Sequence, residues 1–269
     1  MKKAVLILIS IFFLQNLQAK NDDVYITNIK KSSYINTYIV NNTLYDITIK
    51  FSAKRKNLIT TDNLPIEKIV KSKSKKLITT FYINANKYSL KSKYSFTIGS
   101  KYAIHNDKYL YRLPYEIGTY QKITQSFNGY FSHKGNSLYA VDFGLKVGTK
   151  IYSAREGIVV NIKNNGYLHG DKKYISHANF ITIRHNDDTY AKYVHLKKGG
   201  VKVKIGQKIK RGQFIGYSGN TGYTSGEHLH LVIFKGKSYN KRESIAIKFI
   251  GANGIISKPI RGQKYKAVK

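Results

Sequence analysis

Apolar and polar residues alternate along the first third of the chain. From residue 22 to about residue 108 this alternation recurs, for example in residues 47–52 and 94–99. A period of two is typical of strands that bury one face, and clusters of turn-forming residues such as 41–43 divide the segment into short strands. Residues 20–112 are therefore predicted to form a β-sandwich of about immunoglobulin size.

Beyond Tyr115 the pattern changes to short apolar runs separated by glycines, as in residues 157–160 and 205–216. Glycine supplies the positive φ angles of tight turns, so this spacing indicates a much-folded sheet without long helices. A compact antiparallel β-sheet domain is predicted for residues 113–240. Residues 241–269 are set apart as a basic C-terminal extension, which is either a final strand or a loose tail.

The two predicted domains meet at Leu113-Pro114-Tyr115. This tripeptide has the character of a linker, because proline fixes its own φ and biases the preceding residue toward extended conformations. The predicted fold class is all-β, with an N-terminal β-sandwich followed by the compact antiparallel sheet.

The first residues carry a targeting pattern. Lysines at positions 2 and 3 precede an apolar run from Ala4 to Leu14, and Ala19 offers a small residue for cleavage. These features fit a signal peptide over residues 1–19, since the apolar run is too short to span a bilayer comfortably. Export to the periplasm or cell envelope is therefore expected. The alternative is an uncleaved N-terminal anchor that holds the protein at the membrane.

Composition narrows the possible partners. Lysine and arginine number 47 against 14 aspartates and glutamates, which gives a formal net charge of +33. Only seven of the 47 are arginines, whereas recognition of bases and phosphates favours arginine, so no nucleic-acid partner is expected. An exported protein of this charge is instead expected to be attracted to an anionic wall or envelope surface.

Histidines supply the candidate chemistry, because the chain has no cysteine and any metal must bind His, Asp or Glu. His228 and His230 lie two apart in a strand-like run, so both side chains point from the same face. Asp142 lies among apolar residues, where a carboxylate is costly to bury unless it is paired or bound to a metal. His133 and His195 are the other candidates. The alternative to a metal or catalytic site is that the histidines are ordinary surface residues and that Asp142 is exposed or forms a salt bridge.

These residues resemble the lysostaphin-type (LytM-like) zinc endopeptidases of peptidoglycan. The resemblance covers residues 115–235 in four ordered blocks: Phe131-Ser132-His133 through Asp142-Phe143, Gly148-Thr149 through Gly157, Tyr193-Val194-His195-Leu196, and Ser218-Gly219-Asn220-Thr221-Gly222 through His228-Leu229-His230. It implies a LytM-like peptidase domain over residues 113–240. The first part is also similar to envelope members that carry an immunoglobulin-like domain before the peptidase.

The resemblance implies a set of site residues as well. A Zn²⁺ ion would be held by His133, Asp142 and His230, and His195 and His228 would assist catalysis. The commonest family spacing puts the first histidine four residues before the aspartate, where this chain has Leu138, and His133 lies nine residues before Asp142. A looped-out segment would still bring His133 to the site.

The implied function is that of an exported zinc metalloendopeptidase that hydrolyses peptide bonds in stem or cross-bridge peptides of peptidoglycan. Three protein ligands leave a fourth position open for a water whose pKa falls to about 7, and histidines suit the proton transfers. The alternative is a catalytically inactive LytM-like protein that binds peptidoglycan or activates a cell-wall amidase. The other histidines, His105, His169, His177 and His185, are expected in loops and turns.

Overall fold

The structure is a computed structural model that describes residues 23–238 and 240–269. The predicted signal peptide, residues 1–19, lies outside the described residues. The described part is 53% strand and 4% helix, which confirms the all-β class. None of its helices is long and apolar enough to cross a membrane.

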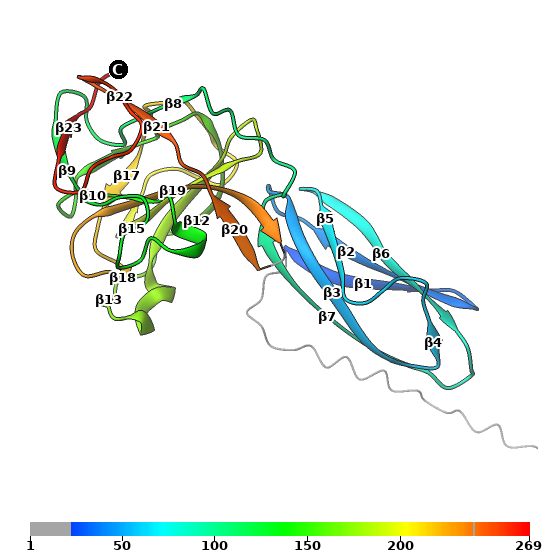
Figure 1. Ribbon diagram of the computed structural model, residues 1–269. Helices are drawn as coiled ribbons and strands as arrows, with labels where there is room; N and C mark the ends of the chain where they lie inside the picture. Colours follow the sequence, from blue (N-terminus) through cyan, green and yellow to red (C-terminus); the bar gives the residue numbers. More distant parts are fainter. Residues whose placement is uncertain (1–22, 239) are drawn as a thin grey trace, which may run out of the picture.

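The described N-terminal residues form two sheets with a shared core (Figure 1). One sheet has the order β1 (Val24–Lys30), β2 (Tyr34–Asn41), β6 (Ser74–Ile83) and β4 (Leu58–Ile59), and the other has the order β5 (Ile66–Val70), β3 (Ile47–Lys56) and β7 (Ser89–Ile98). Burial alternates along β2 as the sequence pattern predicts, with Ile35 and Ile39 buried. These side chains belong to one hydrophobic cluster with Ile49 and Phe51 of the other sheet.

The second part is built on an eleven-stranded sheet. Eight strands follow the order β16 (Lys208–Ile209), β12 (Gly157–Lys163), β14 (Asn179–Arg184), β15 (Tyr190–Val201), β19 (Leu229–Ser238), β10 (Val141–Gly144), β9 (Tyr120–Gln125) and β23 (Lys264–Lys266). In addition, β11 (Lys150–Tyr152) pairs with β17 (Phe214–Ser218), β17 pairs with β15, and β20 (Lys241–Ser244) pairs with β19. One face of this sheet packs on a core that includes Phe143, Tyr193 and Leu231.

Short elements complete the second part. β13 (His169–Gly170) and β18 (Gly222–Tyr223) form a parallel pair. The 3₁₀ helices η1 (Gly135–Ser137) and η2 (Lys172–His177) have three and six residues. Both 3₁₀ segments lie in connections between strands of the large sheet.

Residues 241–269 contain four strands in the described structure. β20 and β23 join the large sheet, and β21 (Lys248–Gly251) pairs antiparallel with β22 (Gly254–Ile256) and parallel with β8 (Leu110–Arg112). Of the two possibilities left open for this segment, a loose tail is therefore wrong.

The tripeptide expected as a linker is part of the core. Leu113 and Tyr115 are buried, and the Tyr115 hydroxyl donates to the backbone oxygen of Tyr265 at 2.7 Å. The reason is that β8, immediately before it, is already paired with β21. The chain passes between its two parts earlier, between β7 and β8 at residues 99–109.

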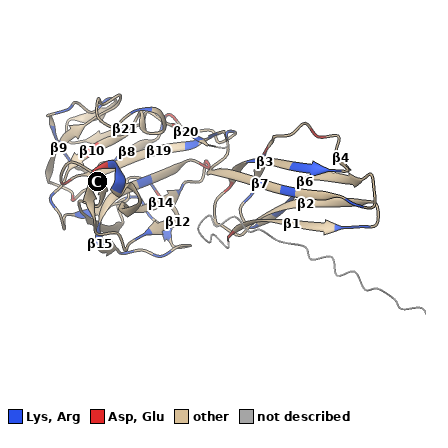
Figure 2. Ribbon diagram, turned by 90° about the horizontal axis from the view of Figure 1, so that it is seen from below, with Lys and Arg blue, Asp and Glu red and all other residues tan. Residues whose placement is uncertain are grey.

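Lysines and arginines are spread over strands and loops of both parts, with few acidic residues among them (Figure 2). The positive charge is therefore not gathered on one element. Such a surface favours general attraction to anionic partners.

The two parts are joined by a continuous hydrophobic contact. Tyr190 of β15 and Phe234 of β19 stack with ring centroids 5.4 Å apart, and both belong to the same cluster as the N-terminal core. Close by, the Gly99 amide donates to the Asp46 carbonyl at 2.8 Å, while the backbone of Gly99 lies directly against Gly236. The contact requires a residue without a side chain at position 236.

A Gly236→Ala substitution is expected to lower the free energy of unfolding by about 1–3 kcal/mol, the usual cost of overpacking. The added Cβ would lie 2.3 Å from the Gly99 carbonyl oxygen, so one backbone must move. Denaturant unfolding measures the change. The matched control is Gly226→Ala, where the Cβ meets nothing within 4 Å. Equal stability of the two variants would contradict the tight contact.

Candidate metal centre

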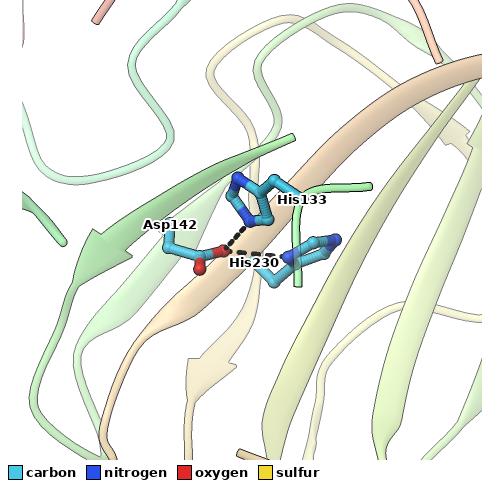
Figure 3. Close-up of side chains that lie close together, drawn as sticks. All are labelled: His133, Asp142 and His230. Atoms are coloured by element: carbon cyan, nitrogen blue, oxygen red, sulfur yellow. Dashed lines mark hydrogen bonds and ion pairs between the residues drawn. The ribbon is translucent and has the colours of Figure 1, made fainter. Parts of the chain in front are cut away.

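Two of the candidate ligands lie directly opposite each other on neighbouring strands. Asp142 of β10 pairs with His230 of β19 in the antiparallel register, so their side chains share one face of the sheet. His230 Nδ1 lies 2.8 Å from Asp142 Oδ1. His133 Nε2 lies 3.1 Å from the same oxygen (Figure 3). One potential ligand atom from each of the three residues lies within 4.8 Å of the others.

His133 reaches the site from the loop between β9 and β10. This loop folds back on itself, since the Asn128 amide donates to the Leu138 carbonyl at 2.8 Å. It also contains the turn η1, and the His133 ring is fully buried. The looped-out path explains how a histidine nine residues before Asp142 can lie beside it, while Leu138 occupies the commoner position.

The contacts of His133 favour one tautomer of its ring. Its Nδ1 lies 2.6 Å from the Ser126 carbonyl oxygen, which can only accept, so Nδ1 carries the hydrogen. Nε2 then presents a lone pair toward Asp142 Oδ1, and this buried nitrogen has no hydrogen-bond partner in the described structure. Two lone pairs at this distance repel each other unless a proton or a metal cation lies between them.

The Asp142 carboxylate is ionised at neutral pH. Burial by itself raises the pKa of Asp142, but His230, His133 and His228 outweigh that effect and hold the pKa far below its usual range. Two imidazoles and one carboxylate form a donor set that suits Zn²⁺ and leaves a fourth tetrahedral position open. The residues present therefore fit a zinc ion.

His195 lies beside these ligands on an irregular part of β15. Its φ is +67°, in the left-handed region that is uncommon for residues other than glycine, and the register of β15 against β17 shifts just after it. Its Nδ1 lies 2.7 Å from the Thr221 carbonyl oxygen. Burial, with the adjacent His228 and His230, lowers the pKa of His195 to about 3. The ring is therefore neutral, with its hydrogen on Nδ1.

His228 precedes β19 and lies against His195, with ring centroids 4.6 Å apart. Its Nδ1 lies 2.8 Å from the Gly226 carbonyl oxygen, which favours the tautomer with the hydrogen on Nδ1. Its Nε2 lies 3.8 Å from Asp142 Oδ2. The structure thus brings together all five residues that the sequence singles out.

Gln125 is a contact residue that sequence reasoning missed. Its Nε2 donates to Asp142 Oδ2 at 3.0 Å and to the Ser132 hydroxyl at 2.9 Å, while its Oε1 accepts from the Phe131 amide at 3.0 Å. Gln125 therefore orients the Asp142 carboxylate, and its hydrogen bonds to Phe131 and Ser132 hold the loop that carries His133 in place. A single glutamine at a strand end gives no pattern in the sequence that could have revealed this.

The remaining histidines make their contacts elsewhere. His105 lies against Asp107 and Tyr111, and the His177 ring packs on Tyr167 and Tyr174. His169 is in β13. His185 is buried, and its Nδ1 lies 2.6 Å from the Glu156 carbonyl oxygen.

A buried His–Asp–His group with two further histidines beside it has the character of a metallopeptidase centre. Residues 136–242 match the model of Peptidase family M23. The match includes Asp142 and the site histidines His195, His228 and His230, and it begins just after His133.

Two curated relatives show the extent of the similarity. The chain is 39% identical over 100 residues to the peptidoglycan DD-endopeptidase ShyA of Vibrio cholerae, which covers 37% of this chain and 21% of the relative. It is 35% identical over 98 residues to lysostaphin of Staphylococcus simulans. That alignment covers 36% of this chain and 18% of lysostaphin. The matched segment thus spans about a fifth of the length of these relatives.

Among solved structures, the catalytic domain of lysostaphin from Staphylococcus simulans is 25% identical to this chain. The alignment covers 47% of this chain and 87% of that one, with a TM-score of 0.34.

Removal of the loop ligand is expected to abolish stoichiometric metal binding. His133→Ala leaves two of the three ligands, so zinc per chain after dialysis should fall well below one, while the wild type retains about one. Elemental analysis measures it. His177→Ala is the control, because the ring of His177 packs on Tyr167 and Tyr174 and lies outside the candidate ligand set. Full zinc retention by His133→Ala would remove His133 from the ligand set.

Loss of the Gln125 amide is expected to weaken zinc binding without removing a ligand. Gln125→Met should raise the zinc dissociation constant about 10–100-fold, the usual effect of losing an outer-shell hydrogen bond. Competition with a chromophoric chelator gives the constant. Gln121→Met, on the same strand, serves as the matched control. An unchanged constant in Gln125→Met would show that Asp142 is oriented without this contact.

Proposed function

We propose that the protein is a zinc-dependent endopeptidase that hydrolyses peptide bonds in stem or cross-bridge peptides of peptidoglycan. The observation that carries the proposal is the His133–Asp142–His230 group, in which a buried imidazole lone pair points at an ionised carboxylate. The family match and the relatives named as peptidoglycan endopeptidases support the choice of substrate.

Zn²⁺ held by these three residues would supply Lewis-acid activation of a water and of the scissile carbonyl. The protein's own part is to move protons. His195 and His228 donate their Nδ1 hydrogens to the carbonyls of Thr221 and Gly226, so each keeps a lone pair on Nε2. One Nε2 can take a proton from the attacking water, and a protonated Nε2 can return one to the leaving amine as the C–N bond breaks.

The proposed place of action is the periplasm or cell envelope. The signal-peptide pattern of residues 1–19 supports export, and the net charge of +33 favours association with an anionic wall or membrane surface. We further propose that residues 20–112 act as an immunoglobulin-like domain joined to the peptidase.

Digestion of isolated peptidoglycan sacculi tests the function. The zinc-loaded wild type is expected to release new muropeptides, and His228→Ala should retain zinc while the rate falls about 10²–10⁴-fold, as for loss of a general acid or base. His177→Ala is the control with normal activity. Chromatography with mass spectrometry identifies the bond that is cut.

The same assay distinguishes the alternative. Binding of the wild type to sacculi with no released muropeptide, despite one bound zinc, would reject the endopeptidase and favour a binding protein or amidase activator. Stimulation of a purified cell-wall amidase would then separate those two roles.

A further inference from the structure

The face of the sheet that carries the metal centre continues beyond it. Val194 pairs with His230 across β15 and β19, and Lys192 pairs with Val232 one step further along the same face. Tyr193, between them, points the other way into the core. Lys192, Val194 and His230 are all partly exposed, so they form a continuous surface beside the proposed zinc site.

The Lys192 side chain extends along this face toward Phe180 of β14. Its ammonium nitrogen lies 4.0 Å from the centre of the Phe180 ring, and Phe180 pairs with Val194. The ammonium therefore lies near the row Phe180, Val194 and His230. Two strand spacings separate Phe180 from His230, which is about 10 Å or three residues of an extended peptide.

Arg242 adds a second cation from β20. Its guanidinium carbon lies 4.6 Å from the centre of the Phe234 ring, and burial lowers the pKa of the Arg242 side chain. Burial, and then the charge of Arg242, lower the pKa of Lys192 to about 8. The two cations are thus partly removed from water and close enough to repel each other.

Neither cation forms a salt bridge within residues 23–238 and 240–269. Elsewhere the chain pairs a comparable group: Arg155 is almost fully buried and lies 2.7 Å from Asp187. Exposed lysines need no such partner, because water solvates them. Two partly desolvated cations without an acid are costly, and an anionic ligand would remove that cost.

We propose that Lys192 and Arg242 form an anion subsite that binds a carboxylate of the peptide whose amide bond lies at the metal centre. The inference rests on the proposed function and adds substrate selectivity to it. Lys192 makes the direct contact, and Arg242 contributes charge from the neighbouring strand. The carboxylate lies about three residues from the scissile bond, given the strand spacing.

The test compares native sacculi with sacculi whose carboxylates have been converted to amides by carbodiimide coupling to ammonia. The readout is the ratio of muropeptide release from the two substrates, measured for each variant. Wild type is expected to prefer native sacculi at least about tenfold, the size of one charge-assisted hydrogen bond. Lys192→Met should bring the ratio close to one, and Lys192→Arg should restore it.

The control is Lys204→Met, which removes the same charge from an exposed turn. Amidation removes negative charge from the sacculi, so it also weakens their general attraction to this very basic protein. Loss of one lysine that takes part only in that general attraction should leave the ratio unchanged, and Lys204→Met is therefore expected to keep the wild-type ratio. If Lys192→Met does not fold, Arg242→Gln takes its place, and it should lower the ratio in the same direction. Thermal unfolding and zinc content identify a misfolded variant.

Equal ratios in Lys192→Met and Lys204→Met would overturn the subsite while leaving the endopeptidase intact. If wild type releases nothing from either substrate, the proposed function fails, and the fraction of protein bound to each form of sacculus is compared instead. A native-to-amidated binding ratio that falls in Lys192→Met, but not in Lys204→Met, supports the subsite. Equal binding ratios overturn it.

Discussion

The pairing of β10 with β19 is the constraint on which the candidate site depends. The register puts Asp142 opposite His230, and both side chains then face away from the core. A slip of one residue would turn one side chain toward the opposite face, because side chains alternate along a strand. The register of β15 against β19 determines the positions of Val194 and Lys192. The same sheet therefore positions both the candidate metal ligands and the surface beside them.

Backbone carbonyls give the site its chemical state. The Nδ1 atoms of His133, His195 and His228 each lie within 2.8 Å of a carbonyl oxygen, which leaves Nε2 free of hydrogen in the neutral ring. Those carbonyls belong to loops and to the irregular segment around Thr221, and not to the regular strands. The sheet therefore positions the ligands, while the loops select their tautomers.

Sequence reasoning could predict what depends on local periodicity. Alternation gave the all-β class, and the spacing of His228 and His230 placed them near one another. The contact of His133 with Asp142 depends on the path of a loop, and Gln125 depends on a hydrogen bond across that loop, so neither follows from spacing alone. Alternation also could not reveal that β8 pairs with β21, which is why Leu113-Pro114-Tyr115 was wrongly expected to be a linker.

The hydrophobic cluster around Tyr190 and Phe234 has a thermodynamic consequence. Since it is continuous with the N-terminal core, exposing either part strips apolar surface from the other. The two parts are therefore expected to melt as one cooperative unit, so that a ligand that binds only the native state stabilises both by mass action. A cation held at His230 would thus raise the melting temperature of strands at the far end of the molecule, although none of them touches it.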